Sequence, residues 1–150
     1  MKTVPGLSSG TQNTAQLRSW ISEVRTLAKE ADRGVISDQQ IGQILAYAPP
    51  DSEDGAWPCR PVRDVIEELA SEEIDRGIAI SRFNQRGVFT KDPFEGGKKE
   101  RAIADQYRSW AEVTRKWPRT SALLRQIAYD WDYNAKRADT EVQLNQLRDS

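Results

Sequence analysis

The sequence predicts an all-α protein, a single-domain bundle of about five helices with long C-terminal helices. Apolar residues recur every three or four positions through most of the chain, which is the helical period. No segment alternates between apolar and polar residues as a half-buried strand would. Five tryptophans among 150 residues supply apolar surface for a packed core. These observations together predict helices around one core.

Two helices are predicted in the first third of the chain, over residues 14–32 and over residues 37–48. Thr14 is a candidate N-terminal cap for the first, and Gly34 can take the left-handed turn after its end. The second starts at Ser37, which begins a capping box, and stops before two consecutive prolines. Residues 1–13 are interpreted as a flexible N-terminal arm, which leaves residues 14–150 as one domain.

The middle of the chain predicts one helix between two loops. Residues 51–60 are poor helix formers, and Trp57 within them is expected to pack onto the helices. Pro61 suits the first turn of a third helix, predicted over residues 61–85. Gly77 either weakens this helix or allows a neighbour to approach closely. Residues 88–97 form the second loop.

The last third predicts a fourth helix over residues 98–116 and a fifth over residues 119–147. Pro118, after Trp117, must end or kink the helical run, because proline clashes with the preceding turn. The two helices are therefore either an antiparallel hairpin or one kinked rod. The residue pattern is compatible with both.

Composition excludes several classes of function. The net charge is −1, so generic attraction to nucleic acid or to an anionic membrane is not expected, and no apolar run is long enough to span a bilayer. The chain has no histidine, which removes the commonest general base and the usual zinc ligands. The single cysteine, Cys59, suits a reducing cytoplasm. The sequence therefore predicts a cytoplasmic protein with no metal site, no cofactor and no recognisable catalytic set.

Charge is divided between two opposite blocks. Residues 51–75 carry nine acidic and two basic side chains, whereas residues 98–125 carry eight basic and three acidic ones. Either the two blocks neutralise each other or lie on solvated faces, or one of them meets a partner of opposite sign. Within the basic block, Arg101, Asp105 and Arg108 begin a series that alternates in sign along one helical face. This series is typical of a solvated ladder of ion pairs.

The leading candidate site lies on the fifth predicted helix. Arg125, Tyr129, Tyr133 and Arg137 are spaced four apart and form one strip, separate from the apolar face that contains Trp131. Tyrosine and arginine combine contact area, hydrogen bonding and cation–π attraction. The strip therefore predicts a non-catalytic module that binds a protein partner or itself. The alternative interpretation is that a second helix covers the strip and half-buries the tyrosines.

The second hypothesis is a nucleic-acid or nucleotide-phosphate site on the basic segment. Two glycines precede two lysines at a predicted helix start, where free backbone N–H groups can hold an anion. The segment does not complete a phosphate-binding loop, because Lys98 would have to be followed by serine or threonine. A plain turn into a helix is the simpler interpretation. The candidate residues are Gly96, Gly97, Lys98, Lys99, Arg101, Arg115, Lys116 and Arg119. A third hypothesis, an enzyme built around residues 84–99, lacks a nucleophile–base pair.

Residues 82–131 contain several distinctive groups of residues. They are Asn84 with Arg86-Gly87, Glu95-Gly96-Gly97, Glu100-Arg101, Tyr107-Arg108 and Trp117-Pro118-Arg119-Thr120. In these groups the segment, about a third of the chain, resembles the carboxy-terminal part of uncharacterised bacterial proteins. The resemblance implies a bacterial or mobile-element origin and brings no catalytic residues with it.

Overall fold

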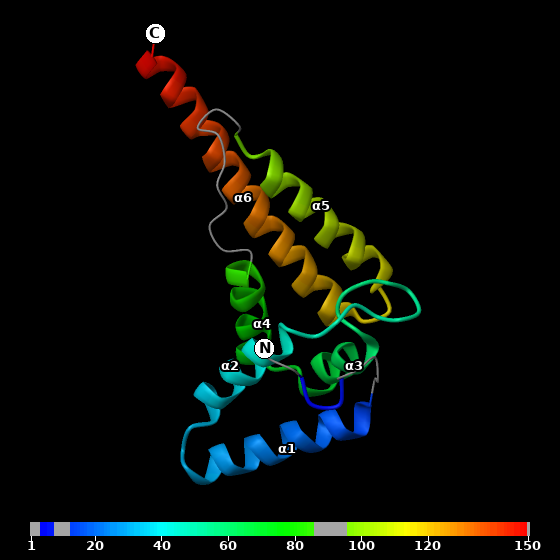
Figure 1. The fold of residues 1–150 in the computed structure, drawn as a ribbon. Helices are drawn as coiled ribbons and strands as arrows, with labels where there is room; N and C mark the ends of the chain where they lie inside the picture. The colour runs from blue at the N-terminus through cyan, green and yellow to red at the C-terminus, as the bar shows by residue number, and fades with distance from the viewer. Residues whose placement is uncertain (1–3, 8–12, 86–95, 150) are drawn as a thin grey trace.

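The computed structural model describes residues 4–7, 13–85 and 96–149, and its described part is helical with no strand. The predicted all-α class is confirmed (Figure 1). Six helices are described instead of the expected five. They are α1 (Thr14–Glu30), α2 (Gly34–Leu45), α3 (Arg60–Leu69), α4 (Glu72–Gln85), α5 (Lys98–Val113) and α6 (Pro118–Asp149).

The two C-terminal helices form an antiparallel hairpin and not a kinked rod (Figure 1). At the end of α5 the Thr114 hydroxyl donates to the Trp110 carbonyl (2.9 Å), and the Trp117 N–H donates to the Thr114 carbonyl (2.8 Å). α6 is twice as long as α5, with 32 residues against 16. Its last turns therefore project beyond the start of α5 and away from the other helices (Figure 1).

The extra helix arises because the segment predicted as one helix over residues 61–85 is broken at Ala70. This alanine adopts a left-handed conformation with φ of 46°, which residues other than glycine rarely adopt. Ser71 then caps α4, since its hydroxyl accepts a hydrogen bond from the Ile74 N–H (3.2 Å), and acidic residues fill the first turn. The single-helix prediction was wrong because it did not weigh this cap.

Two other helix ends differ from the prediction. Asn13, and not Thr14, caps α1, because its side chain accepts from the Gln16 N–H (2.9 Å). The left-handed residue after α1 is Asp32, with φ of 56°, and Gly34 is the first residue of α2. The second helix therefore begins three residues before Ser37.

Gly77 allows a close approach, one of the two roles predicted for it. α2 and α4 cross so tightly that a Cβ on Gly42 would lie 2.2 Å from the Ile74 carbonyl oxygen, and one on Gly77 would lie 2.4 Å from the Gln39 carbonyl oxygen. Real side chains do not reach such distances. The two glycines thus define where these helices cross.

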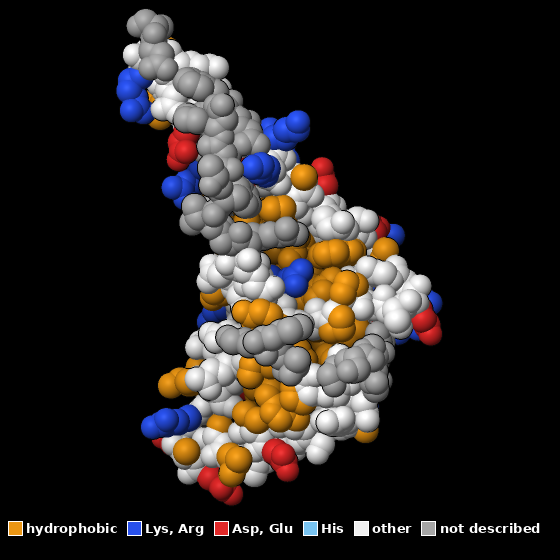
Figure 2. All heavy atoms as spheres, viewed as in Figure 1, with side chains coloured by type: hydrophobic (Ala, Val, Ile, Leu, Met, Phe, Trp, Pro, Cys, Tyr) orange, Lys and Arg blue, Asp and Glu red, His pale blue; other side chains and the backbone are white. Residues whose placement is uncertain are grey.

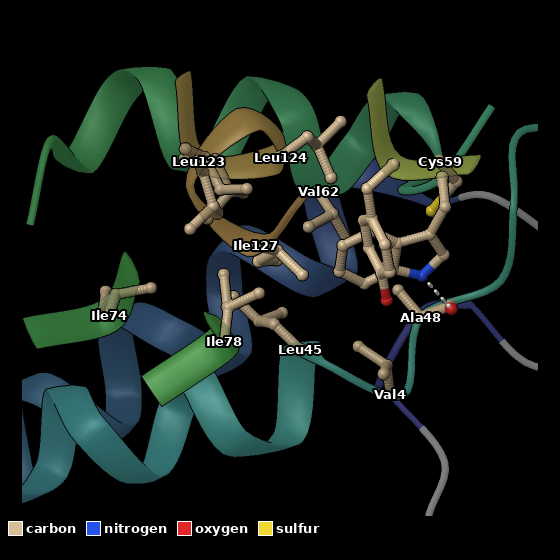
Figure 3. Close-up of a cluster of buried hydrophobic side chains, with 14 of the residues drawn as sticks. Val4, Leu45, Ala48, Cys59, Val62, Ile74, Ile78, Leu123, Leu124 and Ile127 are labelled. Atoms are coloured by element: carbon tan, nitrogen blue, oxygen red, sulfur yellow. Dashed lines mark hydrogen bonds between the residues drawn. The ribbon is translucent and has the colours of Figure 1, made fainter. Parts of the chain in front are cut away.

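The core draws on every helix and on the N-terminal segment. Figure 3 shows Leu45 from α2, Ile78 from α4 and Ile127 from α6 facing one another. Trp57 packs onto the helices as predicted: it is 1% exposed and its indole N–H donates to the Ala48 carbonyl (2.6 Å). Val4 and Leu7 are also buried in this core, so residues 4–7 of the expected flexible arm are packed. Residues 1–3 and 8–12 lie outside the described residues.

Arg63 on α3 organises the loop between α2 and α3. Its guanidinium is fully buried and donates to both carboxylate oxygens of Asp54 (2.8 Å each), to the Pro58 carbonyl (2.6 Å) and to the Ala56 carbonyl (2.8 Å). It also lies over the Trp117 ring, 4.8 Å from the centroid. One side chain therefore joins α3 to this loop and to the turn between α5 and α6.

Replacing Gly42 by alanine should lower the free energy of unfolding by about 1–3 kcal/mol, because the added methyl group overlaps backbone atoms of α4. Gly34→Ala is the matched control, since a Cβ there meets nothing within 4 Å and Gly34 lies in the same helix. Urea unfolding followed by circular dichroism compares the two. Equal stabilities of the two variants would contradict the close crossing of α2 and α4.

Asp54 should contribute to acid unfolding. Its hydrogen bonds to Arg63 lower the pKa of Asp54 from 3.8 to about 2, so its contribution to stability is present above the unfolded value and is lost as the pH falls towards 2. We expect the wild-type chain to lose more stability than Asp54→Asn between about pH 4 and pH 2. If the free energies of unfolding of the two proteins change in parallel with pH over this range, Asp54 is not held by Arg63.

Candidate functional site

The two tyrosines of the predicted strip lie on the outer face of α6. Tyr129 is 66% exposed and Tyr133 is 57% exposed, although both belong to a helix whose opposite face packs in the core. This exposure does not match the alternative in which a second helix covers them. The flanking arginines differ from each other, because Arg125 reaches α5 and pairs with Glu112 (3.4 Å), whereas Arg137 is exposed.

A shallow groove of about 300 Å³ adjoins the strip. α4 contributes Ala79, Ile80, Phe83 and Asn84 to it, and α6 contributes Asp130, Tyr133 and Asn134. Phe83 stacks on Trp131 with 4.4 Å between ring centroids, which fixes the spacing of the two helices beside the groove. The tyrosine strip therefore borders an apolar depression, and Tyr133 belongs to both.

Sequence reasoning missed two residues that extend the strip. Leu144 is 52% exposed and Leu147 is 71% exposed, both on the projecting end of α6. A helix turns about 100° per residue, so these leucines lie within roughly 40° of Tyr133 around the axis. The sequence contains the signal for this, because Leu144 and Leu147 follow Tyr133 by eleven and fourteen residues, and both spacings return a helix to nearly the same face. The outer strip, defined here as Tyr129, Tyr133, Arg137, Leu144 and Leu147, therefore runs along much of α6.

The predicted anion site at the start of α5 is filled by a carboxylate of the chain itself. Asp139 of α6 accepts from the Gly97 N–H (2.9 Å) and pairs with Arg101 (2.7 Å). Gly97 is pressed against α6, since a Cβ there would lie 2.4 Å from the Ala135 carbonyl oxygen. Gly96 adopts a left-handed turn with φ of 73°. These contacts match the simpler interpretation, a turn into a helix.

The remaining candidates for nucleic-acid binding lie at the other end of α5. Arg115 pairs with Glu112 (3.5 Å), Arg119 pairs with Asp75 (2.7 Å) and Lys116 is exposed. Sixteen helical residues, roughly 24 Å, separate this group from Gly97, Lys98 and Lys99. Figure 2 shows basic and acidic side chains scattered over one face of the molecule. The eight candidates therefore do not form one basic patch.

The acidic and basic blocks meet at the start of α6, where Arg119 pairs with Asp75 (2.7 Å). The Glu67 carboxylate accepts from the Arg119 N–H (2.6 Å) and the Thr120 N–H (3.4 Å), and so caps a helix fifty residues away in sequence. Asp64 accepts from the Trp117 indole N–H (3.0 Å). The predicted contact between the blocks is therefore present, but it is made by the start of α6 and not by the exposed face of α5.

The predicted ladder on α5 is also present, with additional partners. Arg108 pairs with Asp105 on α5 and with Asp132 on α6. Arg115 and Arg125 share Glu112. Much of the charge on α5 is therefore used to join the two helices of the hairpin.

The single thiol of the chain is buried and is not activated. Cys59 is buried, and burial raises the pKa of its thiol to about 11, so the thiolate is scarce at neutral pH. Within the described ranges no three or more Cys, Asp or Glu side chains gather as metal ligands, and no helix could span a membrane. Residues 86–95, the centre of the loop in the enzyme hypothesis, lie outside the described residues.

A larger groove of about 930 Å³ lies between α1, α3 and the start of α2. Four basic and four acidic side chains line it, and two ion pairs, Arg18 with Glu68 and Arg25 with Asp38, lie within it. Its lining charges cancel. The groove therefore has no charge preference that would define a class of ligand.

Comparison of the chain with protein-family models, with curated proteins and with solved structures finds no match. The resemblance to uncharacterised bacterial proteins therefore stays a prediction.

Removing the carboxylate that caps α6 should weaken the fold. We expect Glu67→Ala to lower the free energy of unfolding by about 1–2 kcal/mol, because two N–H groups at the start of α6 lose their acceptor. The neighbouring variant Glu68→Ala removes only a half-exposed ion pair with Arg18 and should cost about 0–1 kcal/mol. Urea unfolding measures the free energy of unfolding of both variants. An equal loss in the two variants would contradict the role of Glu67 as the cap of α6.

Proposed function

We propose that this chain is a non-catalytic helical interaction module and that the outer face of α6 is its contact surface. The observation that carries the proposal is the exposure of two tyrosines on consecutive turns of one helix, 66% for Tyr129 and 57% for Tyr133. Their burial by a partner removes large apolar areas from water while the phenol groups keep hydrogen-bonding capacity. Tyrosine and arginine are enriched among the residues that dominate binding energy.

The position of the strip supports this function. α6 is held along its opposite face by the core and by the ion pairs to α5, so the tyrosines are presented on a rigid element. A rigid contact surface loses little conformational entropy on binding. The groove beside Tyr133 offers a partner an apolar depression between α4 and α6.

The buried thiol and the paired arginines support a cytoplasmic module that binds protein. Cys59 is a single buried thiol, which suits the reducing cytoplasm, and we place the module there. Three of the six cations proposed for nucleic acid, Arg101, Arg115 and Arg119, are paired with carboxylates of the chain. A protein surface is therefore the class of partner that fits the outer face of α6 best.

Site-specific photo-crosslinking in the cells that make this protein tests the proposal. A benzophenone side chain at position 129 or 133 should yield covalent adducts with protein, because both positions lie inside the proposed contact. Tyr47 is the matched control, since it is also an exposed tyrosine (40%) but lies just after α2. Adducts of equal yield from position 47, or none from positions 129 and 133, would contradict the proposal.

A further inference from the structure

We propose that the partner of the outer strip is a second copy of this chain, bound through an antiparallel pairing of two α6 helices. The inference rests on the proposed function, because it uses the same face of α6. Four of the ten large apolar side chains that are exposed in the described part belong to this one helix face: Tyr129, Tyr133, Leu144 and Leu147. No other described helix carries more than two of these ten side chains.

The apolar residues match one another when the helix is reversed. Tyr129 and Leu147 lie at the two ends of the strip, and Tyr133 and Leu144 lie inside them by four and three residues. Reversal about a two-fold axis near residues 138 and 139 therefore brings Tyr129 opposite the partner's Leu147, and Tyr133 opposite the partner's Leu144. Each layer then joins one aromatic and one aliphatic side chain, which is the self-complementarity that a symmetric dimer requires.

The charges beside the strip match in the same register. Asp130, Glu141 and Arg148 lie on the flank of the strip nearest Arg137, and all four charges are roughly 40–80° from Tyr133 around the axis. In the reversed pairing, Arg137 meets the partner's Glu141 and Asp130 meets the partner's Arg148. The two-fold axis repeats both contacts, so four opposite-charge pairs form and no like charges meet on this flank.

These charges are available for a partner. Among the described residues, neither Arg137 nor Glu141 forms an ion pair within the chain. Asp130 and Arg148 have only amide partners, Gln126 (3.1 Å) and Asn145 (3.0 Å). By contrast, Asp132 and Asp139, on the side of α6 that faces α5, are paired with arginines of α5. On this flank of α6, the charges that remain without an ion pair are therefore those that the reversed pairing uses.

The shape of the molecule permits this dimer. α5 packs against the side of α6 that carries Asp132, Ala135 and Asp139, which is not the side of the strip. The last turns of α6, which carry Leu144 and Leu147, project beyond α5 (Figure 1). In the antiparallel arrangement the two sets of helices α1–α4 lie at opposite ends of the pair. The partner's Leu147 then lies close to the groove formed by Ile80, Phe83 and Tyr133. The overlap of residues 129–147 spans roughly 27 Å, a small interface, so we expect a dissociation constant of roughly micromolar magnitude.

A charge exchange tests both the partner and the orientation. Arg137→Glu places two acidic residues opposite two acidic residues in the homodimer, and Glu141→Arg places basic residues opposite basic ones. Each variant alone should dimerise about tenfold more weakly than the wild-type chain or worse. An equimolar mixture should regain the dimer, because every contact on that flank then joins opposite charges. The double variant R137E/E141R should also dimerise as the wild-type chain does.

Size-exclusion chromatography with light scattering, run as a dilution series from about 1 µM up to about 100 µM protein, spans the dissociation constants expected for the wild-type chain and the variants and measures these states. Each single variant also places like charges four residues apart on its own helix, but this effect persists in the mixture and so cannot explain a recovery. A wild-type chain that is monomeric at about 100 µM, or a mixture that stays monomeric, overturns the inference.

The photo-crosslinks separate the two proposals. Adducts of positions 129 and 133 with a different protein would sustain the contact surface and exclude the second copy, whereas the absence of any adduct would exclude both.

Discussion

The buried guanidinium of Arg63 is the interaction on which the arrangement of the helices depends. A charged group removed from water is costly unless it is paired and hydrogen-bonded, and Asp54 together with two carbonyl oxygens meets this requirement. The same side chain lies against Trp117. It therefore fixes the loop after α2 and ties α3 to the turn where the C-terminal hairpin reverses direction.

The direction of α6 follows from this contact. Two acids one and four residues after Arg63 bind the start of α6, Asp64 through the Trp117 indole and Glu67 through backbone N–H groups. Further along, Phe83 stacks on Trp131 and α5 pairs with α6 through Asp132 and Asp139. These contacts hold three sides of the helix and leave one face outward. The exposed tyrosines are thus a consequence of how α6 is held.

Residue spacing predicted the parts of the structure that depend on local periodicity. The all-α class, the hairpin as one of two alternatives, the packing of Trp57 and the separation of Tyr129 and Tyr133 from the core face all followed from it. The break at Ala70 did not, because alanine carries no preference for a left-handed conformation. The buried role of Arg63 and the pairing of Asp139 with Gly97 also escaped prediction, since each depends on tertiary contacts that residue spacing does not encode. Leu144 and Leu147 were missed because they were treated as the end of a helix and not as a surface.

The central claim is that the outer face of α6 meets its own copy in reverse. Pulsed electron spin resonance measures this directly, with one spin label at the exposed position 136 (Lys136→Cys) and, in a second protein, one at the exposed position 126 (Gln126→Cys). Cys59 is buried with a raised thiol pKa and should not take the label. The antiparallel pairing predicts a label-to-label distance below roughly 20 Å at position 136 and roughly 40 Å at position 126. Short distances at both positions would indicate a parallel pair, and no dipolar signal at either position would contradict the contact altogether.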